Sequence, residues 1–323
     1  MKISTKPTKV VDSLFQEGMV VRHTTEIRRE KPNKPNPKLA AALAAIHKKY
    51  GAEALTTVVG GRPVPVKGIK TQWQALDDLL TGDVDEKNRT IPGTGVGLPR
   101  GRIIEISGLE SSGKSTTVLH LICAVQKAGG TAVYIDAEHS FDPKYAAALG
   151  VDLATLQMCQ PDSAEQGLDV AVDLAKSGAV DFIAIDSVSA LVPEAENDTD
   201  MGKQHMGLQA RLMGKALRKI TAPISRSGCV LVFVNQVRMK IGMVFGNPEV
   251  TSGGNALKFY ASIRLDIRKV KTLKKGDKNI GIRSRIKVVK NKCAPPFREL
   301  FVDLLPGKGI VVVHSDPDLG EPP

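Results

Sequence analysis

Between Arg102 and Gln236 the chain alternates apolar runs of strand length with amphipathic segments of helical length, and this alternation constrains the fold more than any other feature. The apolar runs are RIIEIS, TAVYIDA, FIAIDS and CVLVFVNQ, and the helical segments are TTVLHLICAVQKAG, AEQGLDVAVDLAKSG and LQARLMGKALRKITAPI. Strands that are apolar throughout and alternate with helices are typical of a parallel sheet covered on both faces. We therefore expect an α/β fold with a mostly parallel sheet flanked by helices.

The regions on either side of this core follow other patterns. After residue 255, the runs SIRLDIRKV, RSRIKVVKN and ELFVDLL predict shorter strands joined by tight polar turns. Upstream, Thr71 and Gln74 have the T-x-x-Q spacing of a capping box and predict the start of a helix that carries Trp73. Residues 81–101 are expected to form a long polar, glycine-rich loop, and residues 38–50 an alanine-rich helix.

Composition is that of an ordinary globular protein with a basic surplus. Hydrophobic residues make up 42% and charged residues 24% of the 323 positions, and 45 Lys and Arg outweigh 34 Asp and Glu to give a net charge of +11. Such a surplus is compatible with a polyanionic partner. The four cysteines are scattered, and no apolar run approaches the ~20 residues that span a bilayer. We therefore expect reduced thiols, no membrane association and a cytosolic protein.

A phosphate-binding loop is the most specific local motif. The segment GLESSGKST, residues 108–116, satisfies the pattern G-x-x-x-x-G-K-[ST] after an apolar strand and before a helix. Its glycines let the backbone curl so that N–H groups and the helix N-terminus face a phosphate. Lys114 is expected to meet the β- and γ-phosphate oxygens and Ser115 to hold Mg²⁺, with a chance Gly/Ser-rich turn as the alternative. The expected nucleotide-binding residues are Gly108, Glu110, Ser111, Ser112, Gly113, Lys114, Ser115 and Thr116.

Acidic residues at strand ends extend this site. Asp186 ends the run FIAID, where an acid can orient the water shell of a magnesium ion. In YIDAEHSFD, Glu138 can position and deprotonate an attacking water, but Asp136 competes with it from spacing alone. The motifs therefore predict hydrolysis of ATP with Mg²⁺, and the residues alone leave the base open between Asp136 and Glu138.

The chain resembles the bacterial RecA recombinases in six segments that keep the family's order and separations. They are GLESSGKST, YIDAEHSFDPKYAAALGVD, AIDSVSALVPEAE, HMGLQARLMGKALRK, FVNQVRMKIGMVFGNPEVTSGGNALKFYASIRLDIR and IKVVKNKCAPPF, within a match from about Gly68 to Ile310. The resemblance implies a RecA-type P-loop core and a DNA-dependent ATPase that forms helical filaments on single-stranded DNA. Such a protein pairs that strand with homologous double-stranded DNA in recombination and repair, in the cytoplasm of a bacterium or of a phage-infected host.

The resemblance also implies roles for residues around the nucleotide. Glu138 matches the family's catalytic glutamate, which decides between it and Asp136. Asp142 and Tyr145 match positions that contact the adenine base. Gln236 matches a glutamine that senses the γ-phosphate and passes this information to the adjacent DNA-binding loop.

Four further matches concern the interface between neighbouring copies. Lys290 and Lys292 match lysines that reach across it to the neighbour's nucleotide. Lys258 and Phe259 match interface residues that couple ATP to filament geometry, and Lys258 thereby joins the nucleotide-binding set. The implied catalytic residues are Lys114, Glu138, Gln236, Lys290 and Lys292.

The implied DNA site consists of two loops, at about residues 197–207 and 237–252, and of the helix that follows the first. Cations there can bind phosphates, and two adjacent glycines can bring backbone N–H groups close to one. Aromatic residues make up only 4% of the chain, so we expect apolar wedges, Met206 and Ile241, rather than a row of stacked rings between the bases. The expected DNA-binding residues are Met206, Arg211, Arg218, Arg238, Lys240, Ile241, Phe245, Thr251, Ser252, Gly253, Gly254 and Asn255.

We expect four parts along the chain. They are a flexible basic arm over residues 1–37, an N-terminal oligomerisation segment over 38–67, a RecA-type ATPase core over 68–310 and a short tail over 311–323. The family usually continues past the equivalent of Ile310 into a small C-terminal domain that helps to gather duplex DNA. A phage-type or otherwise divergent member fits this shorter pattern, in which the arm and the loop at 81–101 look like additions.

Two other functions use the same core. A ring helicase forms closed hexamers and unwinds DNA, and the segment FGNPEVTSGGNALKFYAS argues against it. A filament or accessory protein can bind ATP without useful turnover, and the intact Lys114, Ser115, Glu138 and Asp186 argue against that.

Overall fold

A computed structural model describes residues 37–51, 66–87, 89–197, 207–239 and 249–313. The chain divides into two units, Met1–Val64 and Pro65–Pro323. In the first unit the described element is α1 (Pro37–Tyr50), which confirms the expected alanine-rich helix, and none of its side chains is buried. The expected arm and most of the expected tail lie outside the described residues.

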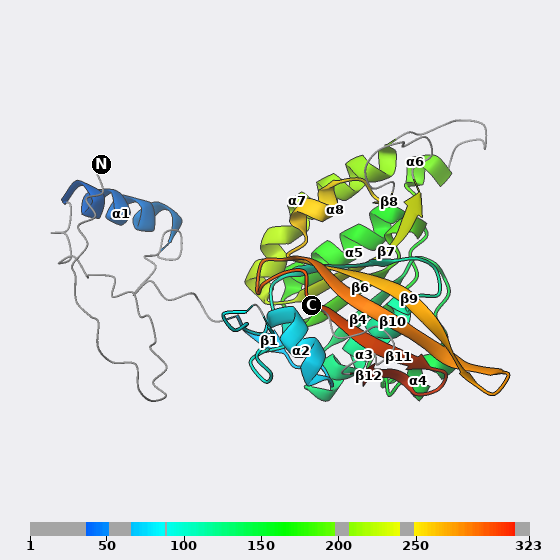
Figure 1. The fold of residues 1–323 in the computed structure, drawn as a ribbon. Helices are drawn as coiled ribbons and strands as arrows, with labels where there is room; N and C mark the ends of the chain where they lie inside the picture. The colour runs from blue at the N-terminus through cyan, green and yellow to red at the C-terminus, as the bar shows by residue number, and fades with distance from the viewer. Residues whose placement is uncertain (1–36, 52–65, 88, 198–206, 240–248, 314–323) are drawn as a thin grey trace, which may run out of the picture. The chain divides into compact units, whose positions relative to one another are not determined.

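The second unit is built on a ten-stranded sheet with a separate two-stranded ladder, β1–β2 (Figure 1). The order of strands across the large sheet is β12-β11-β10-β9-β3-β7-β6-β4-β5, and β8 pairs with β7. The strands are β1 (Gly68–Ile69), β2 (Leu98–Pro99), β3 (Ile103–Gly108), β4 (Ala132–Asp136), β5 (Gln157–Cys159), β6 (Phe182–Asp186), β7 (Val230–Met239), β8 (Glu249–Thr251), β9 (Ile263–Lys275), β10 (Lys278–Asn291), β11 (Glu299–Leu305) and β12 (Gly309–Val313). The helices are α2 (Gln74–Thr81), α3 (Lys114–Lys127), α4 (Pro143–Ala148), α5 (Ala164–Ser177), the short η3 (Val188–Ala190), α6 (Glu194–Asn197), α7 (Leu208–Ser227) and α8 (Ala256–Tyr260).

The sheet is parallel where the sequence predicts it. From β9 through β3, β7, β6 and β4 to β5 each neighbouring pair is parallel, whereas β9, β10, β11 and β12 pair antiparallel. The expectation of shorter strands after residue 255 is wrong for β9 and β10, which have 13 and 14 residues and meet in a hairpin. Backbone pairing carries this hairpin beyond the buried part of the sheet, so the side chains near its tip are exposed and follow no apolar pattern.

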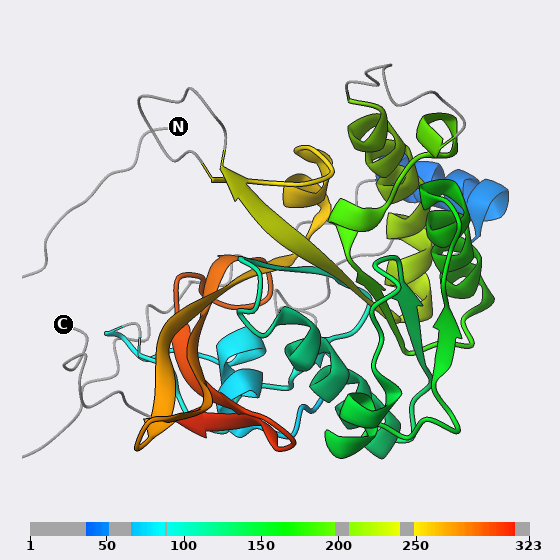
Figure 2. The same cartoon turned by 90° about the vertical axis from the view of Figure 1, so that its right-hand side faces the viewer.

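Strand residues alternate between two cores, one on each face of the sheet. In β6, Phe182 and Ala184 pack with residues of α3, whereas Ile183 and Ile185 pack with residues of α5 and α7. The side-chain period of two in a strand produces this division, and an all-apolar run results because both faces are covered. Figures 1 and 2 show α5 and α7 on one side of the sheet and α3 on the other. No helix in the described part of the chain is both long and apolar enough to cross a bilayer.

The capping box predicted at Thr71 and Gln74 is wrong. Gln74 is already the first residue of α2, and Trp73 stands at the cap position without a side-chain cap. Thr71 instead donates its backbone N–H and its hydroxyl to Asp77 Oδ1, at 2.8 and 2.7 Å. Asp77 is 1% exposed, and a buried carboxylate requires such donors, which outweighs the local capping pattern.

His120 on α3 fastens the last strand to the body of the unit. Its Nε2 accepts a hydrogen bond from the backbone N–H of Ile310 at 2.9 Å, and its ring meets Trp73 edge-on at 4.7 Å between ring centroids. Burial lowers the pKa of His120 from 6.5 to about 4. The folded chain therefore keeps this imidazole neutral at pH values where an unfolded chain protonates it.

We expect the free energy of unfolding to fall as the pH is lowered from 7 to 5, because only the unfolded chain takes up the His120 proton between its ordinary pKa of 6.5 and about 4. The His120 contribution to this loss is about 2 kcal/mol at pH 5. Denaturant unfolding at the two pH values measures it. His120→Gln keeps an acceptor for Ile310 but does not titrate, so it should remove about that part of the pH dependence; equal dependence in both proteins would contradict the assignment.

Candidate functional site

The phosphate-binding loop connects β3 to α3 in a shape that only small residues allow at two positions. Gly113 has a φ of +101° and precedes α3 without a side-chain cap, so the first N–H groups of the helix are left for a ligand. A Cβ on Gly108 would lie 2.3 Å from the carbonyl oxygen of Ile267, and one on Gly113 would lie 2.3 Å from Leu304 Cδ1. Gly108 is therefore required by the close approach of the β9 backbone, and Gly113 by its positive φ.

Lys114 and Asp186 face each other at this loop in a largely buried environment. Lys114 is 9% exposed, and its Nζ donates to the carbonyl oxygen of Leu109 at 2.8 Å. Burial lowers the pKa of the Lys114 ammonium, and the negative charges of Asp186, Glu138 and Glu110 oppose that shift. The nearby carboxylates thus help to keep a buried cation charged beside the loop.

Asp186 ends β6, as the sequence predicts. Burial raises the pKa of Asp186, and hydrogen bonds from Ser115 and Tyr134 oppose the increase. The Tyr134 hydroxyl donates to Asp186 Oδ2 at 2.9 Å. The prediction missed Tyr134, although its position two residues before Asp136 places both on one face of β4.

The oxygens of Ser115 and Asp186 fit a magnesium ion that binds together with phosphate. Ser115 is exposed at the start of α3 and its hydroxyl is bonded to Asp186. Across the described ranges, no three His, Cys, Asp or Glu side chains converge to hold a metal by themselves. Mg²⁺ commonly keeps several waters and binds one or two protein oxygens plus substrate phosphates, so a two-residue set suits it.

The two competing acids at the end of β4, Asp136 and Glu138, have different surroundings. Asp136 is fully buried and accepts hydrogen bonds from the backbone N–H groups of Ser140 and Phe141 and from Gln160 Nε2, at 3.2, 3.1 and 3.0 Å. Those bonds occupy its oxygens within the fold. Asp136 therefore holds the loop that follows β4, and the exposed acid of the pair is Glu138.

Glu138 is bonded directly to Gln236. Glu138 Oε1 accepts from Gln236 Nε2 at 3.0 Å and from Ser187 Oγ at 2.5 Å. Parallel pairing explains the meeting, because β6 pairs with both β4 and β7, so the residue after β4 and the residue near the end of β7 reach the same edge of the sheet. The sequence reasoning missed Ser187, which follows Asp186 and can be found only once β4 and β6 are known to be neighbours.

The residues expected at the adenine base lie on α4, beside the phosphate loop. Asp142 caps α4 by accepting from the backbone N–H groups of Lys144 and Tyr145, at 2.8 and 3.1 Å. The Tyr145 hydroxyl lies 3.0 Å from Thr116 Oγ1, on the first turn of α3. α4 is thus fixed against the helix that begins at Lys114.

The lysines expected at an interface lie away from the phosphate loop of their own chain. Lys290 Nζ donates to the carbonyl oxygens of Lys258 and Phe259, at 2.6 and 3.0 Å. In the sheet, Lys290 is in register with Arg264 of β9, which is in register with Glu105 of β3. Glu105 lies three residues before Gly108, so Lys290 is displaced from the phosphate loop by roughly 10 Å along the strand direction. The structure therefore does not bring Lys290 to the chain's own nucleotide site, and Phe259 beside it is 74% exposed.

The described DNA-site residues lie at the same end of β7 and along α7. Arg211 and Arg218 are exposed on α7, and Arg238 is exposed in β7, where it pairs with Val250 of β8. The hydroxyls of Thr251 and Ser252 are buried and have no hydrogen-bond partner within the described residues. Asn255 is exposed at the start of α8. The other expected residues of this set, Met206, Lys240, Ile241 and Phe245, lie outside the described ranges.

The glycine pair after Ser252 is held against two elements. Gly253 and Gly254 have φ values of +78° and +76°. A Cβ on either would lie 2.7 Å from a neighbour, Val188 Cγ1 for Gly253 and Ala210 Cβ for Gly254. The turn between β8 and α8 therefore sits tightly against η3 and the start of α7.

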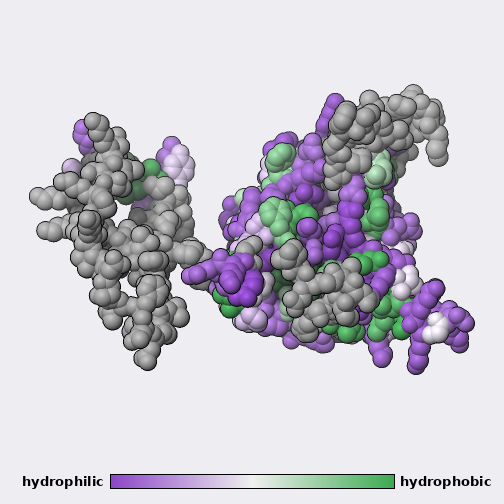
Figure 3. All heavy atoms as spheres, in the orientation of Figure 1, coloured by the Kyte–Doolittle hydropathy of each residue, from purple (hydrophilic) through white to green (hydrophobic). Residues whose placement is uncertain are grey.

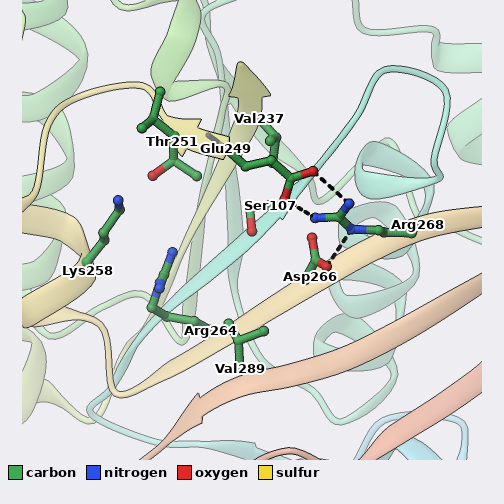
Figure 4. Close-up of a pocket in the computed structure, with 10 residues that line it drawn as sticks. Ser107, Val237, Glu249, Thr251, Lys258, Arg264, Asp266, Arg268 and Val289 are labelled. Atoms are coloured by element: carbon green, nitrogen blue, oxygen red, sulfur yellow. Dashed lines mark hydrogen bonds and ion pairs between the residues drawn. The ribbon is translucent and has the colours of Figure 1, made fainter. Parts of the chain in front are cut away.

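A polar cavity of about 320 Å³ separates the end of β7 from β9, and Figure 4 shows its lining. On one wall, Arg268 binds both oxygens of Glu249 at 2.7 and 2.5 Å and donates to Asp266 Oδ2 at 2.7 Å. Those carboxylates raise the pKa of the Arg268 guanidinium. The sequence reasoning missed this group, although the alternation of Asp266 and Arg268 in IRLDIRKV already placed them on one face of a strand.

The match to known proteins is extensive. A family model, the RecA N-terminal domain, matches residues 37–311. The chain belongs to the RecA family. The Protein RecA of Clostridioides difficile (strain 630) is 60% identical over 272 residues, which cover 84% of this chain and 74% of that protein. Those of Acinetobacter baylyi (52% identical over 84% of this chain and 74% of that protein) and Arthrospira platensis (51%, over 88% and 74%) are similar to it as well.

Membership confirms the predicted RecA fold and function. The chain is an ATP-dependent DNA recombinase of recombination and repair, and its enzymatic activity is DNA-dependent hydrolysis of ATP. RecA proteins use ATP and magnesium, which agrees with the donor set at Lys114, Ser115 and Asp186.

Proposed function

We propose that this chain hydrolyses ATP in a site that a neighbouring copy completes, and that bound ATP holds the chain in a helical filament on single-stranded DNA. The observation that carries the proposal is the hydrogen bond between Glu138 and Gln236, because it joins the proposed hydrolytic acid to the strand that leads to the DNA residues. From Gln236, β7 continues two residues to the exposed Arg238.

In the hydrolytic step, the loop N–H groups and Lys114 hold the phosphates, and Glu138 takes a proton from the attacking water. Ser187 and Gln236 fix the Glu138 carboxylate, so its free oxygen can face that water. Ser115 and, through water, Asp186 would hold a magnesium ion, which would supply positive charge to the β- and γ-phosphates. Asp142 and Tyr145, on α4, are proposed to contact the adenine base.

The neighbouring copy is proposed to contribute Lys290 and Lys292, with Lys258 and Phe259 in the same interface. Support comes from the register, which keeps Lys290 roughly 10 Å from its own phosphate loop, and from the exposure of Phe259. A surface that completes a site on a different surface of the next copy is heterologous and produces a helix unless it closes into a ring. The proposed parts are an arm over 1–37, an oligomerisation segment over 38–67, the core over 68–310 and a tail over 311–323.

DNA binding is proposed to rest on phosphate contacts. Arg211, Arg218 and Arg238 are exposed cations that can bind phosphate oxygens, and Thr251 and Ser252, whose buried hydroxyls have no hydrogen-bond partner within the described residues, are proposed to belong to the same site. Gly253, Gly254 and Asn255 offer backbone and amide donors, and Met206, Lys240, Ile241 and Phe245 complete the set. Base pairing with a homologous duplex then supplies the sequence recognition, in the cytoplasm of a bacterium or of an infected host.

Replacement of the proposed base separates hydrolysis from binding. Glu138→Gln should lower kcat for DNA-stimulated ATP hydrolysis by about 10²- to 10³-fold, because the amide cannot accept the proton of water. ATP-dependent binding of single-stranded DNA should persist, since the amide oxygen can still accept from Gln236. Asp136→Asn is the matched control: it should chiefly lower the unfolding midpoint, because an amide cannot accept all the bonds that Asp136 accepts. A larger kcat effect at Asp136 would reverse the two roles.

Loss of one phosphate contact should weaken DNA binding equally on all sequences. For Arg211→Ala we expect the slope of log affinity against log salt to flatten by roughly 0.7, the value for one contact on single-stranded DNA. Fluorescence anisotropy at several salt concentrations and on several sequences measures this slope. Arg226→Ala, at the far end of the same helix, serves as the exposed control and should leave the slope unchanged. A loss confined to particular sequences would argue against backbone-dominated binding.

Electron microscopy tests the assembly itself. With single-stranded DNA and a slowly hydrolysed ATP analogue, the full chain should form helical filaments. Closed rings, or material that stays monomeric with both ligands present, would overturn the proposed assembly and favour a ring enzyme.

A further inference from the structure

The loop between β10 and β11 presents an aromatic residue in an unfavourable conformation. Phe297 has a φ of +70°, and its side chain is 70% exposed. A bulky residue rarely adopts the left-handed region, and exposure of its ring gains nothing within one chain. The surrounding structure must therefore hold this loop in place, and the ring is available to something outside the chain.

Hydrogen bonds fix the loop at its two ends. At its start, Asn291 Nδ2 donates to the carbonyl oxygen of Leu80 at 2.9 Å, while Asn291 Oδ1 accepts from the N–H groups of Cys293 and Ala294. At its end, the Phe297 N–H donates to the carbonyl oxygen of Val288 at 2.7 Å. The loop is thus closed on β10 and tied to the end of α2.

Arg298 makes a second contact between the loop and α2, and it also contacts the segment that carries Thr90. Its side chain donates to the carbonyl oxygens of Pro295 and Leu79, at 3.2 and 3.0 Å, and to Thr90 Oγ1 at 3.3 Å. Arg298 is 8% exposed, and burial lowers the pKa of its guanidinium, with the charges of Asp78 and Asp83 opposing the shift. One buried side chain therefore connects the loop, the last turn of α2 and the segment that carries Thr90.

That segment, described over residues 82–87 and 89–95, lies within the long loop that the sequence marks as an addition to the family pattern. It folds back on α2, because Asp78 accepts from the N–H groups of Gly93 and Gly95 at 2.9 and 2.8 Å. Val84 and Thr90 pair across its two arms. The fold of this segment therefore places the Thr90 hydroxyl within hydrogen-bond distance of Arg298, and we call the segment the brace.

We propose that Arg298 is a positioning residue for hydrolysis in the adjacent copy of this chain. It holds the loop of residues 292–297 so that Lys292 and Phe297 meet the neighbour beside its nucleotide, and the contact with Thr90 braces Arg298. This inference rests on the proposed function. A second copy is the occupant because the loop begins directly after Lys290, whose ammonium is bonded to the backbone of the exposed Phe259, so the loop continues the surface assigned to the neighbour.

The physical reason for a brace is pre-organisation. A loop that is ordered before contact avoids the ordering cost at the moment of binding, and an exposed aromatic ring at its end can then act as an anchor. Arg298 is suited to this because its planar fork binds three oxygens in fixed directions, which a lysine does not reproduce. Without Arg298 the loop keeps the hydrogen bonds of Asn291 and of the Phe297 N–H but loses three others, so its position is less well fixed.

We expect Arg298→Met to raise the ATP concentration for half-maximal DNA-stimulated hydrolysis about tenfold, as the loss of a charged hydrogen-bond set predicts, with a smaller change in kcat at saturating ATP. Thr90→Val removes only the contact with the brace and should raise that concentration about threefold, without the folding risk of the first change. Arg89→Ala is the matched control, because Arg89 is exposed on the same segment and pairs with Asp85 instead. It should have no effect; unchanged ATP dependence in both Arg298→Met and Thr90→Val would overturn the inference.

Mixed filaments distinguish action on the neighbour from a defect within one subunit. Glu138→Gln has an inactive site but an intact loop, whereas Arg298→Met has an intact site and a displaced loop. At subsaturating ATP, an equimolar mixture should hydrolyse ATP faster than the mean of the two separate proteins, because the first supplies its loop to the second. A mixture no faster than that mean would show that Arg298 acts only within its own subunit.

A reference pair separates this result from failure of the proposed function. Glu138→Gln mixed with Lys290→Ala tests whether any group reaches the neighbour's nucleotide. If this pair recovers activity and the Arg298→Met pair does not, the inference about Arg298 is wrong and the shared site stands. If neither pair recovers activity, the shared site is wrong, and the inference falls with it.

Discussion

The parallel pairing of β3 with β7 and of β4 with β6 is the constraint on which the site depends. Parallel strands end at one edge of a sheet, so residues far apart in sequence meet wherever their strands stop together. The register places Gly108 opposite Gln236 and Asp136 opposite Asp186. A shift of one residue in either pair would turn the side chains to the other face and separate the phosphate loop from Glu138 and Gln236.

The buried charged groups Lys114 and Asp186, at this edge of the sheet, are tolerated because each has partners. Lys114 is nearly buried, yet three carboxylates lie near enough to oppose the shift of its pKa. Asp186 is buried too, and two hydroxyls donate to it. An unpaired charge at either place would cost several kcal/mol, so the site is a balanced set rather than a collection of independent residues.

The sequence predicted the parallel half of the fold and the phosphate loop well, because both depend on local patterns. The apolar runs around Ile106 and Ile185 report burial on two faces, and the loop motif reports a backbone shape. It predicted the start of α2 less well, since the Thr71 hydroxyl donates to the buried Asp77, six residues away, and the capping-box rule does not contain this contact. It also underestimated β9 and β10, whose backbone pairing continues beyond the buried part of the sheet.

Within the site, spacing could not decide between Asp136 and Glu138. The difference lies in what each oxygen meets, and that depends on the loop after β4 and on the neighbouring β7. The role of Arg298 was equally hidden, because Leu79 and Thr90, which accept its hydrogen bonds, lie more than two hundred positions away in the sequence. Residue type and order identify a motif, whereas contacts between segments distant in sequence can be identified only in the three-dimensional structure.

The antiparallel strands have a kinetic consequence through the phosphate loop. Ser284 Oγ of β10 donates to the carbonyl oxygen of Ser112 at 2.9 Å, and Leu304 of β11 lies directly against the α-carbon of Gly113. Both contacts fix the backbone of the phosphate loop at Ser112 and Gly113 without a ligand. We therefore expect nucleotide to bind without a rearrangement of this turn, so that the frequency of productive encounters governs the association rate and the contacts made afterwards govern the residence time.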